Sequence, residues 1–146
     1  MDLGIYSAAL LRLAAEATGA GRLAKCDASA DILNPTCGDR ITVDVGIAEG
    51  RIAALGYEVH ACVLTQASAS LIGRHAVGCS AAEIRAVAER IEAMLRVGSE
   101  LPVGAWADYA VFAPVRGHKS RHECVMLPLR ALLAALAAGG AQDRGS

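Results

Sequence analysis

The chain is 146 residues long, has a formal net charge of −1 and contains five cysteines. This length can bury about two-thirds of the unfolded surface, so we expect a single domain over residues 1–146. The near-neutral charge argues against a nucleic-acid-binding protein, and no apolar run approaches the roughly 20 residues that span a bilayer. Asp2, Arg12 and Glu16 interrupt the first apolar stretch, so we expect no signal peptide and a cytoplasmic location.

The first half of the chain predicts a helix followed by short strands. An apolar stripe indicates a first helix that ends near residues 19–21, and residues 32–33 indicate a short strand. Isoleucine and valine alternate with polar residues and glycine over residues 40–47, which is the pattern of a half-buried strand. After a Glu-Gly turn, residues 52–59 return as a second strand, so these two strands form an antiparallel hairpin.

The second half is predominantly helical. Residues 65–75 have a helical pattern, and Ser80 with Glu83 forms a capping box for a helix that stops at Gly98. Residues 101–114 predict a loop and a short helix, and a leucine-rich helix ends the chain. Pro128 is tolerable only in the first turn of that helix, which places Cys124 at its N-terminus. The predicted fold is α+β, a small antiparallel three-stranded sheet with helices packed on one face.

One hexapeptide, Asn-Pro-Thr-Cys-Gly-Asp at residues 34–39, has the composition of a ligand turn. It places a soft thiolate, Cys37, two positions from a hard carboxylate, Asp39. Gly38 allows the backbone to turn tightly enough for both side chains to converge on one metal ion. Asn-Pro and Gly-Asp also occur in ordinary turns, and a lone cysteine is usually a small buried residue.

Two further cysteines strengthen the metal hypothesis. Cys62 and Cys124 each lie where a loop is predicted to enter a helix, and Cys37 and Cys62 flank the two outer ends of one hairpin, which are neighbours in space. An odd number of cysteines does not suit a disulfide framework. In a reducing compartment, spaced cysteines more often bind metal or take part in chemistry.

At these positions the chain resembles the U-type iron–sulfur cluster assembly proteins, the family of IscU, SufU and the N-terminal domain of NifU. Three blocks in the same order carry the resemblance: Asn-Pro-x-Cys-Gly-Asp at 34–39, Cys62 with Ala-Ser-Ala-Ser at 67–70, and Cys124 with Leu127. The resemblance extends over roughly residues 5–138. It implies that Cys37, Asp39, Cys62 and Cys124 are the ligands of a metal ion or cluster.

Within this family the chain is more similar to SufU. The segment between Cys62 and Cys124 is long, as in SufU-type proteins, and Arg121 occupies the SufU-like Arg-x-x-Cys position. Glu123 precedes Cys124 where IscU has a histidine, and the chaperone-docking Leu-Pro-Pro-Val-Lys segment of IscU is missing from the sequence. Residues 59–62 lack the two glycines usual in the family, so this loop should be stiffer.

Three thiolates and one carboxylate suit Zn²⁺, Fe²⁺ or one edge of a [2Fe–2S] cluster. A structural zinc site is the simpler alternative, but such sites usually pair their cysteines at Cys-x-x-Cys spacing, which this chain lacks. Asp39 favours exchange over permanence, because a carboxylate is a harder and more labile partner than a fourth thiolate. Its alternative role is a turn cap.

Other side chains near the candidate ligands have weaker assignments. His60 and His122 each precede a cysteine by two positions and could replace a ligand during exchange, although such histidines more often form loop hydrogen bonds. Donors at the helix starts, with Arg40 and Arg121 nearby, should lower the thiol pKa values. Cys26 and Cys79 lie outside the motif blocks, and we expect them outside the site.

The resemblance implies three functions that share the same ligands. As in IscU and NifU, the chain would accept sulfur from a cysteine desulfurase of the SufS or IscS type, bind iron, assemble a transient [2Fe–2S] cluster and pass it to apo iron–sulfur proteins. As in SufU, zinc at the four ligands would free Cys124, supported by Arg121, to accept persulfide sulfur as a zinc-dependent sulfurtransferase. A structural zinc protein is the third alternative. A non-enzymatic scaffold is our first expectation.

Overall fold

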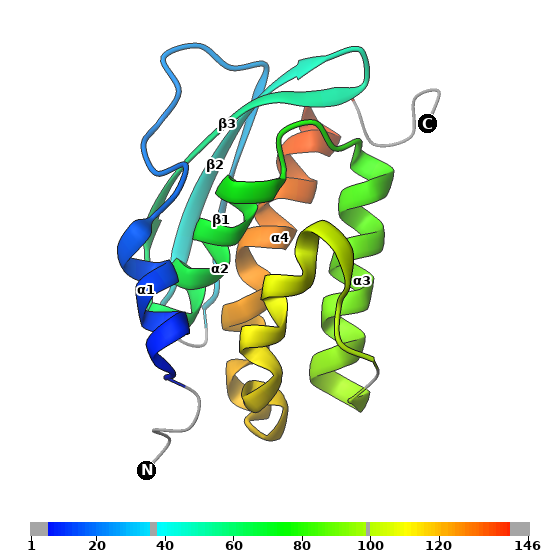
Figure 1. Cartoon of the computed structure of the whole chain (residues 1–146). Helices are drawn as coiled ribbons and strands as arrows, with labels where there is room; N and C mark the ends of the chain where they lie inside the picture. The colour runs from blue at the N-terminus through cyan, green and yellow to red at the C-terminus, as the bar shows by residue number, and fades with distance from the viewer. Residues whose placement is uncertain (1–5, 36–37, 99, 141–146) are drawn as a thin grey trace.

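A computed structural model describes residues 6–35, 38–98 and 100–140. It confirms the predicted α+β class, because three antiparallel strands form one sheet and the helices pack on one face of it (Figure 1). The elements in chain order are α1 (Ala8–Glu16), β1 (Ala28–Leu33), β2 (Arg40–Ala48), β3 (Arg51–His60), α2 (Val63–His75), α3 (Ala81–Val97), the 3₁₀ helices η2 (Gly104–Gly117) and η3 (Lys119–Arg121), and α4 (His122–Ala138).

The β2–β3 hairpin brings the two halves of the candidate site together. The strand order is β1-β2-β3, and Arg40 pairs with His60 at the open end of the hairpin. Asp39 precedes the first of these residues and Cys62 follows the second by two positions, so both lie at the same end of the sheet. The alternating apolar residues of β2 point into the core, where Ile41, Val43 and Val45 are buried. β1 begins at Ala28, earlier than the predicted short strand.

The opposite face of β2 is also partly covered. The period-two pattern of this strand places Asp44 on the solvent side, but its side chain is buried. The Asp44 carboxylate accepts hydrogen bonds from the Arg22 guanidinium, at 2.7 and 3.0 Å, from the Leu23 N–H at 3.0 Å and from the Ser29 hydroxyl at 2.5 Å. These donors belong to the segment between α1 and β1, together with the start of β1. Local alternation could not reveal a cover that comes from elsewhere in the chain.

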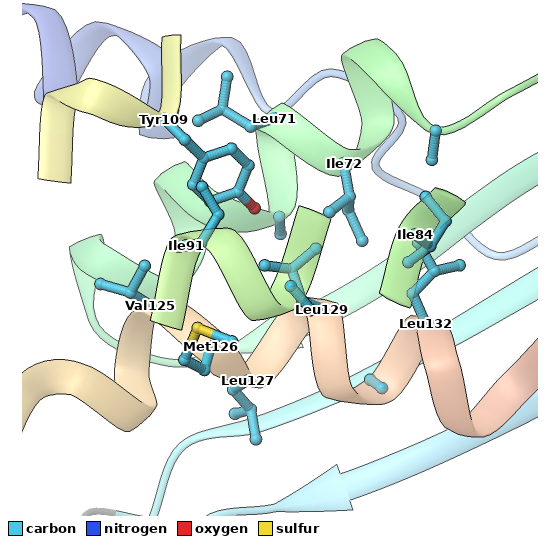
Figure 2. Packing of buried hydrophobic residues seen from close by; sticks show 14 of the residues in the cluster. Leu71, Ile72, Ile84, Ile91, Tyr109, Val125, Met126, Leu127, Leu129 and Leu132 are labelled. Carbon is cyan, nitrogen blue, oxygen red and sulfur yellow. The ribbon is translucent and has the colours of Figure 1, made fainter. Parts of the chain in front are cut away.

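The core lies between the sheet and a layer of helices in which α2, α3 and α4 converge. Figure 2 shows side chains from these helices pointing toward one another, with Tyr109 of η2 beside Leu71 and Ile91. α4 contacts β1 and β2 as well as α2 and α3, so it connects the sheet to the rest of the helical layer. Along the described ranges, no helix is both long enough and apolar enough to cross a membrane.

The helix boundaries confirm one prediction and correct another. Ser80 and Glu83 form the expected capping box at the start of α3, and Gly98 ends that helix in a left-handed conformation. The expectation that Pro128 lies in the first turn of the last helix is wrong, because α4 begins at His122 and contains Pro128 in its interior. A hydroxyl group from α2, described below, compensates for part of the disruption that this proline causes.

Candidate metal centre

Three of the four predicted ligands converge at one end of the molecule. The ligand atoms of Asp39, Cys62 and Cys124 all lie within 4.8 Å of one another. Asp39 directly precedes β2, Cys62 is the N-cap residue of α2, and Cys124 lies in the first turn of α4. The fourth predicted ligand, Cys37, lies outside the described residues. Three segments distant in sequence therefore contribute to one potential coordination site.

Two backbone hydrogen bonds hold Asn34, Gly38 and Asp39, the described residues on either side of Cys37, close together. The Asn34 N–H donates to the Asp39 carbonyl at 2.7 Å, and the Gly38 N–H donates to the Asn34 carbonyl at 2.8 Å. Gly38 adopts a φ of 79°, in the left-handed region that glycine reaches at least cost. These contacts hold Asp39 at the base of the turn, directed toward the start of α2.

The Asp39 carboxylate is buried and accepts two hydrogen bonds from α2. Oδ1 accepts from the Cys62 backbone N–H at 3.2 Å, and Oδ2 accepts from the Thr65 hydroxyl at 3.1 Å. Cys62 makes no side-chain capping bond of its own to the helix. Asp39 therefore stabilises the beginning of α2 from a distant position in the chain, and its carboxylate is fixed beside both thiols.

The two described thiols of the site differ in exposure. Cys62 is exposed, whereas Cys124 is only 6% exposed. The pKa of Cys62 is lowered to about 6, first because the Cys124 thiol donates a hydrogen bond to the Cys62 thiolate. The Thr65 N–H and hydroxyl lower this pKa further, while burial and the negative charge of Asp39 oppose the shift. The neighbouring thiol and Thr65 thus favour the thiolate form of Cys62 at an exposed position of the site.

Arg40 and Arg121 were expected to lower the pKa values of the thiols, but in the structure both guanidinium groups contact other residues. The Arg40 guanidinium forms a bidentate pair with Asp31 on β1, at 2.9 and 2.6 Å. Arg121 donates to the hydroxyl of Tyr6, and its guanidinium carbon lies 5.8 Å from the centre of the Tyr6 ring. The donors that lower the thiol pKa are instead the neighbouring thiol and Thr65. Arg121 connects the N-terminal segment to the helix that carries Cys124.

The two histidines near the cysteines make contacts away from the thiols. The His60 side chain is exposed, and its Nε2 lies 3.8 Å from the Glu58 carboxylate. His122 is buried, and its Nε2 lies 2.9 Å from the Arg116 carbonyl, a group that can only accept a hydrogen bond.

Cys26 lies near Ser29 on β1, and the thiol of Cys79 points to the His75 carbonyl. Both of these cysteines lie outside the cluster formed by Asp39, Cys62 and Cys124.

The donor set suits Zn²⁺ or Fe²⁺. Two ligands on one ion can be separated by at most the sum of two bonds of about 2.3 Å, and the measured separations are already close to this scale. Two thiolates with a carboxylate are a mixed soft and hard donor set that both ions accept. Cys62 contributes its thiol at the surface, while Asp39 and Cys124 contribute their ligand atoms from the interior.

Thr65 is the residue of the site that sequence reasoning missed. It is fully buried, and its hydroxyl lies 3.1 Å from Asp39 Oδ2, 2.9 Å from the Cys124 carbonyl and 3.6 Å from Cys62 Sγ. The available signals were a hydroxyl residue one helical turn after Cys62, and a proline four residues after Cys124. Neither signal was interpretable without knowing that α2 and α4 lie side by side.

Comparisons with known proteins show which family the whole chain is similar to. The family model for the NifU-like N terminal domain matches residues 5–137. The iron-sulfur cluster assembly scaffold protein IscU of Thermotoga maritima is 29% identical over 132 residues, which cover 90% of this chain and 92% of that protein.

Two crystal structures have a similar fold. The NifU-like protein (N-terminal) of Brucella abortus superposes with a TM-score of 0.90 at 32% identity, covering 95% of this chain and 96% of that one. A putative scaffold protein for the SUF system from Fervidobacterium islandicum superposes with a TM-score of 0.83, covering 91% of this chain and 97% of its own. At 23% identity, this second structure shows a shared fold only.

Proposed function

The chain belongs to the NifU-like N-terminal domain family, and from this premise we propose that it is an iron–sulfur cluster assembly scaffold. In this function it binds iron, accepts persulfide sulfur from a cysteine desulfurase, which an external reductant converts to sulfide, and transfers the resulting [2Fe–2S] cluster to apo iron–sulfur proteins. The observation that carries the proposal is the convergence of Asp39, Cys62 and Cys124 within 4.8 Å from three separate segments.

The proposed ligands are Cys37, Asp39, Cys62 and Cys124. Cys62 faces solvent and holds the cargo where a donor or acceptor protein can approach. Asp39 and Cys124 are buried and fix the inner side of the site. A carboxylate is displaced from iron more readily than a thiolate, so Asp39 is the ligand that makes the cargo transferable. We assign this function to the whole chain, residues 1–146, as one domain.

We propose a reducing compartment such as the cytoplasm, because the proposed ligands act as reduced thiols. Cys26, Cys62, Cys79 and Cys124 are all free thiols. Disulfides are rare in the cytosol, where thiols are kept reduced and remain available as metal ligands. The proposed partners, a desulfurase of the SufS or IscS type and apo acceptor proteins, would meet the chain at the surface around Cys62.

Anaerobic assembly tests the proposal. The full chain is incubated with Fe²⁺, cysteine, a cysteine desulfurase and dithiothreitol, which reduces the persulfide sulfur to sulfide, and cluster formation is followed by visible circular dichroism before an apo ferredoxin is added. We expect a cluster signal that moves to the ferredoxin, loss of the signal in Cys62→Ser, and no loss in Cys79→Ser, whose thiol lies outside the site. Equal assembly in the wild type and in Cys62→Ser would contradict the proposal.

A zinc-dependent sulfurtransferase is the second candidate, favoured by the exposed Cys62 thiolate and by the SufU-like position of Arg121. In this reaction an acceptor thiolate attacks the terminal sulfur of the desulfurase persulfide. The new S–S bond forms at the acceptor as the old one breaks, and the desulfurase thiolate leaves. The sequence suggested Cys124 as the acceptor. However, Cys124 is buried in a helical turn, whereas Cys62 is accessible as it stands.

Persulfide mapping by mass spectrometry separates these two acceptors. The full chain is loaded with Zn²⁺ and incubated with the desulfurase and cysteine, without iron. Loss of the persulfide in Cys62→Ser alone assigns acceptance to Cys62, and loss in Cys124→Ser alone assigns it to Cys124. An absence of persulfide on the wild-type chain would contradict the second candidate function.

A further inference from the structure

The proline inside α4 removes a hydrogen bond at one of the proposed ligands. A helical residue normally donates its N–H to the carbonyl four positions earlier, and for residue 128 that acceptor is the Cys124 carbonyl. Pro128 has no N–H, so this helical bond cannot form. The Thr65 hydroxyl of α2 lies 2.9 Å from the same carbonyl and donates to it. A side chain from one ligand-bearing helix thus compensates for a defect in the other.

The Thr65 hydroxyl is also within hydrogen-bond distance of the Asp39 carboxylate. Thr65 Oγ1 lies 3.1 Å from Asp39 Oδ2, but a threonine hydroxyl has one proton to donate. Neither the carboxylate nor the carbonyl can donate in return, so these two acceptors compete for this proton, and the Cys62 thiol at 3.6 Å is a more distant third acceptor. Thr65 is fully buried and Asp39 is 6% exposed, so bulk water cannot easily substitute for either bond. The Thr65 proton is therefore shared between the side chain of Asp39 and the backbone carbonyl of Cys124, two of the proposed ligand residues.

We propose that Thr65 is a positioning residue whose hydrogen bond passes from Asp39 to the Cys124 carbonyl when Asp39 turns toward a metal ion. The inference rests on the ligand set of the proposed function. While Thr65 donates to Asp39, it holds the carboxylate in place and competes with an ion for Oδ2. When Asp39 turns away, the Cys124 carbonyl, which cannot bond to the missing N–H of Pro128, accepts the Thr65 proton, so the buried hydroxyl keeps an acceptor.

Two substitutions should act in opposite directions. Thr65→Val preserves the shape of the side chain and removes the hydroxyl donor. Thr65 then no longer competes with a bound ion for Asp39 Oδ2, so the ion should be released more slowly. Pro128→Ala restores an N–H that competes for the Cys124 carbonyl. The Thr65 proton then stays with Asp39, and the ion should be released faster. A hydrogen bond of ordinary net strength corresponds to roughly threefold to tenfold in each rate.

Two controls separate this role from simple packing. Thr65→Ser keeps the hydroxyl and should restore the wild-type release rate. Ser68 is a matched control, because its hydroxyl donates from α2 to the next carbonyl of α4, that of Val125, at 2.7 Å. It also bonds to the Tyr109 hydroxyl, and it makes no hydrogen bond to Asp39. Ser68→Ala should therefore lower the melting temperature without changing the release rate.

The test measures release of Co²⁺ from the full chain into excess chelator under anaerobic conditions, using the thiolate-to-cobalt absorption band as the signal. Melting temperatures of the metal-free variants are recorded in parallel. Slower release in Thr65→Val and faster release in Pro128→Ala, with Thr65→Ser and Ser68→Ala near wild type, supports the inference. Rate changes of the same sign in Thr65→Val and Pro128→Ala, or no change in either, overturn it.

The same experiment distinguishes failure of this inference from failure of the proposed function. If the wild-type chain binds Co²⁺ without a thiolate band, the proposed ligand set is wrong, whatever Thr65 does. If the band is present and the variants behave alike, the ligand set stands and the switching role of Thr65 is wrong. Should Thr65→Val fail to fold, Pro128→Ala still decides, because unchanged or slower release in that variant overturns the inference.

Discussion

Cys62 combines solvent exposure with a hydrogen-bond donor held beneath it. The buried Cys124 thiol stabilises the Cys62 thiolate more than the nearby Asp39 charge destabilises it, and the net result is a pKa of about 6. Above that pH, the site presents a nucleophile and metal ligand without any metal being present to deprotonate it. Chemistry at this position should therefore depend on which protonation state of Cys62 dominates.

The pH dependence of alkylation tests this directly. In metal-free protein, we expect the iodoacetamide reaction of Cys62 to rise through about pH 6, because only the thiolate reacts. Cys79, whose pKa is raised mainly by burial, should remain a slow-reacting thiol across the neutral range. Cys124→Ala removes the donor and should move the Cys62 midpoint to higher pH. A Cys62 midpoint near 9 in the wild type would show that the thiols do not share a proton.

Asp39 has both a structural and a functional role, which one substitution can separate. Asp39→Ala removes the acceptor for the Cys62 N–H and the Thr65 hydroxyl, so stability should fall by about 1 kcal/mol. A chain of this size should then melt roughly 3 °C lower. Co²⁺ release should also accelerate, by roughly tenfold or more, because one ligand is lost.

The measurements are calorimetry of the metal-free variant and chelator competition of the loaded one. If Asp39 were only a cap, the melting temperature would fall while the release rate stayed at the wild-type value. That result would remove Asp39 from the proposed ligand set.

The sequence predicted which residues converge better than it predicted the side chains that hold them in place. Cys62, Cys124 and Asp39 were found because their chemical type and the surrounding motifs are local features. Thr65 was not, because its role depends on the side-by-side packing of α2 and α4, and on a carbonyl that lacks its helical partner. Arg40 was misjudged for a similar reason, since Asp31 on the neighbouring strand holds its guanidinium.

Helix boundaries were predicted correctly where a few consecutive residues determine them. The capping box at the start of α3 needs only four consecutive residues, and both of its hydrogen bonds are present. The start of α4 was misplaced because the rule against proline in helix interiors ignores donors from other elements. Here Thr65 provides such a donor, and the helix continues through Pro128.

Replacement of the α3 cap should lower stability without affecting the metal centre. Ser80→Ala removes the acceptor for the Glu83 N–H, and we expect a loss of about 1 kcal/mol in the free energy of unfolding. Because α3 begins away from the ligand cluster, the rate of Co²⁺ release should equal that of the wild type. Urea titration gives the stability. A changed release rate would mean that the site is sensitive to global stability, and would weaken every kinetic comparison above.

At the scale of the whole molecule, the segment before β1 is fastened to the outer face of the sheet by Asp44. Its carboxylate accepts from Arg22, Leu23 and Ser29, and these donors lower its pKa, with Arg22 contributing most. A carboxyl group with a lowered folded-state pKa stabilises the protein above its ordinary pKa, and this contribution is lost as pH falls through the folded value. This attachment should therefore weaken only in acid.

Asp44→Ala should lower the free energy of unfolding by about 2 kcal/mol or more at neutral pH, because several charge-assisted hydrogen bonds are lost together. The difference between variant and wild type should begin to shrink as the pH falls below the ordinary aspartate pKa of about 4, where the unfolded chain takes up the proton, and should be lost at the lower pH that protonates the folded carboxylate. Urea denaturation across this pH range gives both quantities. A difference that does not depend on pH would assign the loss to packing instead of charge.

We propose that the cluster of Asp39, Cys62 and Cys124 holds a transferable iron–sulfur cargo. The most direct test is the content of iron, zinc and acid-labile sulfide in the chain isolated anaerobically, and again after incubation with Fe²⁺, cysteine, a desulfurase and dithiothreitol as reductant. We predict equal amounts of iron and sulfide after incubation, and their loss in Cys62→Ser. Bound zinc without sulfide, both before and after incubation, would contradict the claim.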